Sequence, residues 1–381
     1  MIASFADPQV AEFRLRVRTW LDQAIAPRWR EHRSELSPEE VFAARHAWDR
    51  QSFDGGYSGL TWPAAFGGQD FGRIEEYVFY EESALAGAPE GLSRVGRLMA
   101  GPTIIACGSP SQRDRYLLPI LTGDQIWCQG FSEPGAGSDL AAIRTRAARD
   151  GDGYRVSGQK IWVSFAHYAD LCLLLALTGD RDARHRNLSM LVVDMHAPGV
   201  TIRPIRQLNG RQEFSEIFFE DVYVPDQDLI GPQDQGWQVA MTVLTNERGM
   251  LEAATRYVDL SAAVQLLRDT AAASGDADLA SRLRYQAGLY TARVEALRWQ
   301  VMRAVEKEVA GRDWSASMAV LKVYWSELYQ EIVATGQNAA GPEHADAWHA
   351  RYLSSRASTI ASGTSEIQRN IIAERVLGLP R

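Results

Sequence analysis

The sequence predicts an α+β protein of several domains, in which a strand-rich middle part lies between two helical parts. Apolar residues recur at helical spacing in the first third, short β-type runs follow from about Ile126, and helical spacing returns after Gly236. A chain of 381 residues is also too long for one ordinary core. We therefore expect a helical domain over residues 1–125, a β domain over 126–235 and a second helical domain over 236–381.

The first part has the apolar spacing of helices, interrupted by glycine and proline. Its helical segments are marked by Phe13, Val17, Trp20, Leu21 and Ile25, and by residues 41–48 and 77–85. Gly55–Gly56, Pro63 and Gly67–Gly68 lie between these segments. Because glycine and proline break helices, they predict loops there.

The middle part consists of short runs of β-type residues. The runs are 127–131, 154–156, 161–164, 171–177, 189–193, 200–205, 214–219 and 222–224. Gly151–Asp152–Gly153 is a hairpin signal. No helical pattern intervenes, so the spacing favours an antiparallel barrel or sandwich over a parallel sheet.

Composition and charge exclude several classes of protein. The net charge is −8 and Lys and Arg form no run, which argues against nucleic acid as a partner. Residues 1–10 lack the apolar core of a signal peptide, and the longest apolar stretch, 171–177, is too short for a membrane span. Cys107, Cys128 and Cys172 show no ligand spacing. We expect a cytoplasmic protein with reduced thiols, no disulfide, no metal and no membrane contact.

The most informative stretch is CQGFSEPGAGSDL, from Cys128 to Leu140. A strand end runs into a turn rich in Gly and Pro, where Ser132 and Ser138 offer hydroxyls beside backbone N–H groups. Such a loop can hold a flat heterocycle and a phosphate through main-chain donors. The alternative is a polar loop that merely joins two strands.

This stretch resembles the first flavin signature of the acyl-CoA dehydrogenase family. The second signature is similar to IQRNIIAER at 367–375, which follows GTS at 363–365. Shorter strings match in the same order, namely GLTWP at 59–63, GQKIW at 158–162 and FFEDVYVP at 218–225. The resemblance covers essentially the whole chain. It implies an N-terminal α-helical domain, a middle antiparallel β-barrel domain and a C-terminal four-helix bundle.

The resemblance implies FAD as cofactor and assigns contacts to its ring half. Gln129, Phe131 and Ser132 correspond to the segment at the isoalloxazine ring, and Trp162 to a tryptophan packed against it. Ser164 replaces a threonine that donates to flavin N5, and it keeps the hydroxyl.

Other matched residues belong to the adenosine half and to the subunit interface. Thr364 and Glu366 match the segment near the adenosine half, at a helix N-terminus suited to phosphate. Gln337 to Gly341 resembles an element that reaches a neighbouring subunit's adenosine, which implies a homodimer or homotetramer. The family's Arg-x-x-Phe-Gly segment has no counterpart between Leu260 and Arg298.

The catalytic base is expected at Glu247. Many family members carry a glutamate immediately before Gly-Thr-Ser, where this chain has Ser362. The isovaleryl- and long-chain-type members instead place it directly before an arginine on a C-domain helix, which matches Glu247–Arg248. The resemblance also places Ser138 near both the cofactor and the CoA arm of the substrate. It places Arg248, Ser362 and Gly363 at the substrate, with the Ser362 backbone N–H as donor to the thioester oxygen.

Helical periodicity supports Glu247 independently. On one continuous helix it is the only charged residue of an apolar face, and Arg248 and Glu252 point elsewhere. The face consists of Ala240, Val243, Leu244, Met250, Leu251, Ala254 and Val258. A carboxylate there would be buried, and burial raises its pKa toward the range of a general base. The alternative is a structural carboxylate bonded to a loop N–H or an arginine.

The expected reaction is dehydrogenation of an acyl thioester between its α and β carbons, acyl-CoA to trans-2-enoyl-CoA. Glu247 would remove the proton and flavin N5 would receive the hydride. The substrate would be an acyl-CoA or acyl-carrier-protein thioester, with electron-transfer flavoprotein as the electron acceptor. One alternative is a flavin oxidase or monooxygenase of the same fold. The other is a non-catalytic subunit of a heterotetramer, as in the actinobacterial-type branch that acts on steroid side chains.

Overall fold

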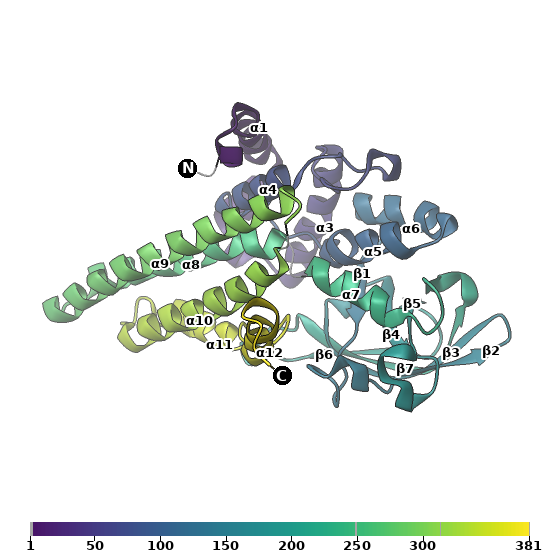
Figure 1. The fold of residues 1–381 in the computed structure, drawn as a ribbon. Coiled ribbons are helices and arrows are strands. Elements are labelled where there is room, and N and C mark those ends of the chain that lie inside the picture. The colour runs from purple at the N-terminus through teal and green to yellow at the C-terminus, as the bar shows by residue number, and fades with distance from the viewer. Residues whose placement is uncertain (1–2, 248–249, 313, 381) are drawn as a thin grey trace. The chain divides into compact units, whose positions relative to one another are not determined.

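The computed structural model describes residues 3–247, 250–312 and 314–380, and the order of its elements is helices, strands, helices (Figure 1). The first helices are α1 (Pro8–Ala24), α2 (Pro27–His32), α3 (Pro38–Asp54), α4 (Arg73–Leu85), α5 (Gly101–Cys107) and α6 (Pro110–Thr122). The strands are β1 (Trp127–Gly130), β2 (Arg146–Asp150), β3 (Gly153–Ser164), β4 (Leu171–Leu177), β5 (Leu188–Asp194), β6 (Val200–Ile205), β7 (Phe214–Pro225) and β8 (Leu229–Ile230). The later helices are α7 (Gly236–Glu247), α8 (Met250–Ala273), α9 (Ala277–Val309), α10 (Ser315–Ala339), α11 (Ala345–Ser355) and α12 (Ser365–Ile371). The predicted fold class is confirmed.

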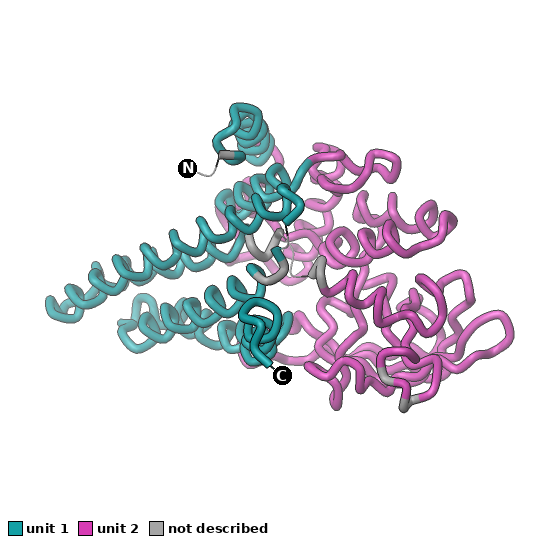
Figure 2. Tube along the Cα trace, viewed as in Figure 1, with its two compact units in different colours: residues 1–22, 72–87, 248–381 teal, residues 23–71, 88–247 magenta. Residues whose placement is uncertain are grey.

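The chain forms two compact units (Figure 2). One contains residues 1–22, 72–87 and 248–381, and the other contains 23–71 and 88–247. The first unit therefore combines α1 and α4 with all the helices from α8 onward. The two units are defined by contacts and not by consecutive domains, so the expected division at residues 125 and 235 stays a prediction.

The second unit is built on one eight-stranded sheet. Its strand order is β6-β7-β3-β2-β4-β5-β8, and β1 pairs with β4. The pairs are antiparallel, as expected, except that β4 pairs in parallel with β1 and β2. The β2–β3 hairpin turns at Gly151 and Asp152, which confirms the predicted turn.

The central strand β4 lies between two cores. All seven of its residues are buried, so its sequence reads as a continuous apolar run. Leu171, Leu173, Leu175 and Leu177 belong to a cluster with residues of α5, α6 and α7. Cys172, Leu174 and Ala176 belong to a cluster with residues of β3 and β7. Because successive side chains of a strand point to opposite faces, β4 separates a helical layer from a β layer.

A capping box fixes the start of α6 and links this helix to the sheet. The Ser109 hydroxyl accepts from the Gln112 amide at 3.3 Å, and the Gln112 side chain accepts from the Ser109 amide at 2.8 Å. The same Gln112 side chain donates to the carbonyls of Gln227 and Leu229, at 2.7 and 2.8 Å. One glutamine therefore fixes the start of α6 and also binds the backbone at and just before β8.

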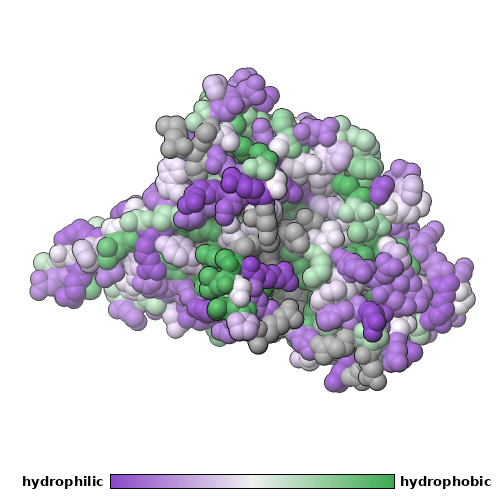
Figure 3. Space-filling model, viewed as in Figure 1, coloured by the Kyte–Doolittle hydropathy of each residue, from purple (hydrophilic) through white to green (hydrophobic). Residues whose placement is uncertain are grey.

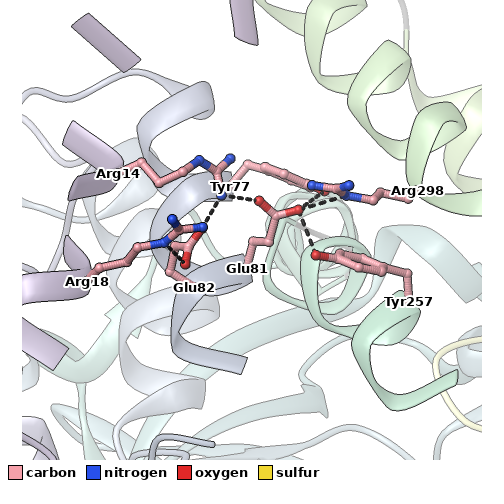
Figure 4. A network of polar contacts seen from close by, with 7 residues as sticks. All are labelled: Arg14, Arg18, Tyr77, Glu81, Glu82, Tyr257 and Arg298. Atoms are coloured by element: carbon pink, nitrogen blue, oxygen red, sulfur yellow. Dashed lines mark hydrogen bonds and ion pairs between the residues drawn. The ribbon is translucent and has the colours of Figure 1, made fainter. Parts of the chain in front are cut away.

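The first unit is held together by α8, which packs on α9, α4 and α10, while α10 also packs on α11 and α12. Figure 1 shows α8 and α9 side by side along their length. At the centre of this unit the Glu81 carboxylate of α4 contacts residues of α1, α8 and α9 (Figure 4). Four helices from three separate stretches of the sequence therefore contact one buried carboxylate.

The face of the molecule drawn in Figure 3 is predominantly polar. Hydrophilic side chains cover most of the face drawn in Figure 3, with small apolar patches between them. Within the described residues, no helix is both long enough and apolar enough to cross a membrane.

Candidate active site

The end of β3 presents an exposed aromatic side chain on a strained backbone. Trp162 has a φ of +61°, which is unusual for a residue other than glycine. The β3–β7 register shifts between Lys160 and Val163, so Trp162 lies in a bulge. Its side chain is 58% exposed and meets Phe214 edge-on, with ring centroids 6.3 Å apart. Strain and an exposed indole together indicate a surface for a flat ligand.

The loop after β1 lies against this part of β3. The Ile161 amide donates to the Ser132 carbonyl at 3.0 Å. Ser132 therefore lies next to Ile161, the residue that precedes Trp162 in β3. The turn is closed by reciprocal backbone hydrogen bonds between Glu133 and Ala136, each 3.0 Å long. Phe131 is buried, while Ser138 is exposed.

Several polar groups of this region lack hydrogen-bond partners within the described part of the chain. They are the backbone amides of Phe131 and Ser132 and the hydroxyls of Ser132 and Ser164. Phe131 is buried, whereas Ser132 and Ser164 are half-buried and accessible to water, so these donors are available to a bound ligand. Donors beside an apolar aromatic surface fit a flat, polar-edged heterocycle.

Behind the loop lies a buried ion pair that the sequence analysis did not identify. The Lys160 ammonium donates to a Glu133 carboxylate oxygen and to the Phe131 carbonyl, both at 2.9 Å. Lys160 is fully buried and Glu133 is 8% exposed. Glu133 and Lys160 stood within the matched strings, but no sequence pattern pairs residues in such separate segments.

The pKa values of both groups are lowered, which favours the charged form of Glu133 but the neutral form of Lys160. Burial raises the pKa of Glu133, but Lys160 and the Thr145 amide outweigh it, so that its pKa is lowered. Burial also lowers the pKa of Lys160, and the Glu133 charge offsets only part of this effect. The hydrogen bonds decide between neutral and ionised forms. Glu133 accepts from three donors and Lys160 has two acceptors, which favours the ionised pair at neutral pH.

In the other unit, the second predicted segment forms a tight turn before α12. Ser362 and Gly363 both have left-handed backbones, with φ of +54° and +92°. The Gln368 side-chain amide donates to the Ser362 carbonyl at 3.1 Å. A Cβ on Gly363 would lie 2.6 Å from the same amide nitrogen, so only glycine fits without displacement.

Thr364 is the N-cap of α12, since its hydroxyl accepts from the Ile367 amide at 3.2 Å. Glu366 is exposed, and hydrogen bonds from its own backbone amide and from Thr364 lower the pKa of its carboxyl. An ionised carboxylate accepts hydrogen bonds and repels anions. The expected role of Glu366 near the adenosine half of the cofactor stays a prediction.

In α12 and near the end of α10, three buried side-chain atoms lack partners within the described residues. They are Ser365 Oγ, Gln368 Oε1 and Gln337 Oε1. Gln337 lies near the end of α10, and Gly341 follows that helix in an exposed position. In native proteins such groups are commonly satisfied by a water molecule, an ion or a ligand.

The expected base lies at the edge of the described residues. Glu247 is the last residue of α7 and its side chain lies outside them, as does the whole of Arg248. The predicted apolar face takes residues 240–258 as one continuous helix; described helical residues run to Glu247 and again from Met250, and residues 248 and 249 lie outside the described part of the chain. The roles of Glu247 and Arg248 stay predictions.

The predicted site residues thus fall into groups. The structure brings together Phe131, Ser132, Trp162 and Ser164 in one unit, with Gln129 one residue before the end of β1 and Ser138 farther along the loop. In the other unit, Ser362, Gly363, Thr364 and Glu366 form one turn, and Gln337 and Gly341 mark the end of α10. Among the described side chains, no group of three His, Cys, Asp or Glu residues could hold a metal ion.

Comparisons with known proteins agree along the whole chain. Residues 7–124, 128–222 and 234–377 match the family models for the acyl-CoA dehydrogenase N-terminal, middle and C-terminal domains. The chain is 41% identical to acyl-CoA dehydrogenase IpdE1 of Mycobacterium tuberculosis over 386 residues, which cover 98% of each chain.

Two solved structures are similar over nearly their full length. The ChsE4–ChsE5 complex from Mycobacterium tuberculosis matches with a TM-score of 0.85 and 29% identity, covering 98% of each chain. The Tcur3481–Tcur3483 steroid ACAD matches with a TM-score of 0.84 and 26% identity, covering 98% of this chain and 99% of that one. The predicted oxidoreductase class is confirmed, together with FAD, the cofactor of the family. The chain belongs to the acyl-CoA dehydrogenase family.

Proposed function

We propose that the protein catalyses FAD-dependent dehydrogenation of an acyl-CoA thioester to the trans-2-enoyl-CoA. The observation that carries this proposal is the ring surface at the end of β3. Trp162, whose indole is exposed, follows Ile161, which is hydrogen-bonded to the Ser132 backbone, and precedes Ser164 by two residues; the hydroxyls of Ser132 and Ser164 lack partners within the described chain. The family match supports the assignment of this region to the flavin ring.

The reaction removes a proton from the α carbon and a hydride from the β carbon. FAD, when bound, accepts the hydride. Glu247 takes the α proton, and the electron pair left by that proton forms the new double bond with the β carbon. The Ser362 amide donates to the thioester oxygen and stabilises the negative charge that develops there. The product leaves as the enoyl thioester, and Glu247 returns its proton to solvent.

The remaining site residues bind and orient the cofactor and the substrate. Trp162 packs on the flavin ring, and Phe131, Ser132 and Ser164 donate to its polar edge, with Gln129 beside them. Thr364, Glu366, Gln337 and Gly341 contact the adenosine half, with Glu366 as acceptor for a hydroxyl. Ser138, Arg248 and Gly363 contact the substrate.

The substrate class follows from a named relative. One structure of the same fold, 26% identical, is titled a steroid ACAD. We infer that a steroid-derived acyl-CoA is the first substrate to test, ahead of short straight-chain thioesters. Electron-transfer flavoprotein would then take the electrons from the reduced enzyme.

Assembly is a second part of the proposal. Gln337 to Gly341 resembles a segment that completes a neighbour's cofactor site, which favours a dimer or tetramer. The ChsE4–ChsE5 structure is titled a complex, so a related second chain is the main alternative to self-association. Light scattering on the purified chain, alone and with a co-expressed related chain, separates the two. A monomer that is stable and fully loaded with FAD would contradict both.

The experiment that tests the function is anaerobic titration of the FAD-loaded protein with a panel of acyl-CoA thioesters. The proposal predicts bleaching of the flavin by at least one steroid-derived acyl-CoA and no rapid turnover with oxygen. Rapid oxygen consumption would indicate an oxidase or monooxygenase. A protein that binds no FAD and acts only with a second chain would be a non-catalytic subunit.

A further inference from the structure

The loop that carries Phe131 and Ser132 rests on a lysine that is fully buried in the protein. Lys160 lies on β3 and has no exposed surface. Lysine is rarely buried completely unless it is paired, because removing an ammonium ion from water is costly. Its partners are the Glu133 carboxylate and the Phe131 carbonyl, both 2.9 Å away. Both hydrogen-bond partners of the Lys160 ammonium group therefore belong to the loop.

Glu133 extends the contact to a third segment. Its carboxylate also accepts from the backbone amides of Arg144 at 2.6 Å and Thr145 at 2.9 Å, just before β2. Together with Lys160 this gives the carboxylate three donors from two segments outside the loop. A shift of the loop would break charge-assisted hydrogen bonds at both ends, so the pair fixes the position of the loop strongly.

The hydrogen bond from Lys160 to the Phe131 carbonyl fixes the direction of the next backbone N–H, that of Ser132. Peptide bonds are planar and trans, and no described peptide bond of this chain is cis. The Ser132 N–H therefore points opposite to the Phe131 carbonyl and so away from Lys160. The next peptide is fixed in the same way, since its Ser132 carbonyl accepts from Ile161 at 3.0 Å. Lys160 thereby sets the direction of an amide that has no partner within the described chain.

We propose that Lys160 and Glu133 are positioning residues for the flavin: the buried pair aims the Ser132 amide at the ring and so sets the affinity for FAD and its reduction potential. This inference rests on the proposed function only in taking the ring site to be the one beside Trp162. A donor aimed at the ring edge favours the more negatively charged, reduced form of the cofactor. Loss of the pair therefore lowers the reduction potential as well as the affinity.

The test compares Lys160→Met, Glu133→Gln and the double variant with the parent. The double variant is central because it replaces an ion pair by a neutral pair of similar volume, a change that is often tolerated in stability. Asp49→Asn is the matched control. Asp49 is also a fully buried carboxylate of this unit, and it accepts from the amides of Leu92 and Ser93 at 2.7 and 2.9 Å, outside the loop.

The readouts are the dissociation constant of FAD from apoprotein, the reduction potential of the bound flavin, and amide hydrogen exchange of residues 131–136 in the apoprotein. We expect Lys160→Met and the double variant to bind FAD about ten- to a hundredfold more weakly, as for the loss of one well-placed donor. The reduction potential falls and exchange in the loop becomes faster. Asp49→Asn lowers the stability but leaves the potential at the parent value.

The outcomes separate this inference from the proposed function. A double variant that folds and keeps the parent's affinity and potential would overturn the positioning role, while the dehydrogenase activity of the parent would stand. If Lys160→Met does not fold, the double variant and Glu133→Gln decide by the same measurements. A parent that binds no FAD would overturn both, and a parent that binds FAD but oxidises no thioester would overturn the proposed function alone.

Discussion

Glu81→Gln should be among the most destabilising single substitutions in the helical unit. Glu81 lies on α4 and is fully buried. Its carboxylate accepts from Arg14 of α1 at 2.5 Å, from Tyr257 of α8 at 2.8 Å, from Tyr77 at 3.0 Å and from Arg298 of α9 at 3.1 Å (Figure 4). The amide keeps one acceptor oxygen but removes the charge and replaces an acceptor by a donor.

The size of the destabilisation depends on how exposed the two arginine partners of Glu81 are. Removing one member of a buried ion pair costs about 3–5 kcal/mol when the other charge is left without compensation. The side chains of Arg14 and Arg298 are 21% and 33% exposed, so water compensates part of this loss. Arg14 also keeps its contact with Glu82. We expect the free energy of unfolding to fall by about 2–4 kcal/mol.

The pH dependence has a defined sign. Burial raises the pKa of Glu81, but Arg14, Tyr257 and Arg298 outweigh it, so the pKa lies below the ordinary value of 4.5. A lowered pKa means that the carboxylate stabilises the folded state above the unfolded pKa and loses this contribution as the pH falls through the folded pKa. The difference between parent and Glu81→Gln is therefore complete at pH 7 and shrinks below about pH 4.5.

Urea unfolding of the apoprotein, followed by circular dichroism, measures the effect, with Glu308→Gln as the control. Glu308 lies on α9 and accepts from Arg73 at 3.0 Å, but its other oxygen is buried without a partner. Burial outweighs Arg73 there and raises the pKa of the carboxyl, so its charge opposes folding at neutral pH. Glu308→Gln should change the stability by less than about 1 kcal/mol in either direction. Equal effects of the two substitutions would refute the reasoning.

Three further substitutions test separate parts of the structure. Trp162→Ala should weaken FAD binding measured by fluorescence titration yet leave the urea midpoint nearly unchanged, because the side chain is 58% exposed; an unchanged affinity would remove Trp162 from the site. Gly336→Ala should destabilise by about 1–3 kcal/mol, because its Cβ would lie 2.3 Å from the buried Trp348 ring, although alanine favours a helix by about 1 kcal/mol; a gain in thermal stability would contradict this. Ser362→Ala should leave the rate of flavin reduction within a few-fold of the parent, whereas Gly363→Ala should lower it strongly through the clash with Gln368; equal rates in the two variants would show that the turn is not required.

The strands of the middle part show what the sequence could predict and where it failed. β4 and β6 match the predicted runs residue for residue, because continuous burial or regular pairing gives a clear pattern. β3 was predicted as two runs, since register shifts at Val156/Gly158 and Lys160/Val163 interrupt its alternation. β2 was not predicted at all, because only Ala147 of its five residues is buried.

The site was predicted through resemblance more than through periodicity. The motif strings led to Ser132 and Trp162, and the structure explains their neighbourhood by a single backbone hydrogen bond from Ile161. The Lys160–Glu133 pair was missed, since a contact between residues of separate segments leaves no periodic signal. The grouping of α1 and α4 with the late helices was missed for the same reason, as it includes the packing of α4 on α8 and α9.

The most direct test of the account is the anaerobic rate of flavin reduction by a reactive acyl-CoA in Glu247→Gln, measured by stopped flow. The amide keeps the size and polarity of the side chain but does not accept the α proton. The variant should retain FAD and bind substrate analogues, while the rate falls by ~10²–10⁴-fold, the usual contribution of a general base. Glu252→Gln, a second carboxylate of the same part of the chain, should reduce its flavin at the parent rate. If Glu247→Gln did so as well, Glu247 would be a structural carboxylate and the proposed mechanism would be wrong.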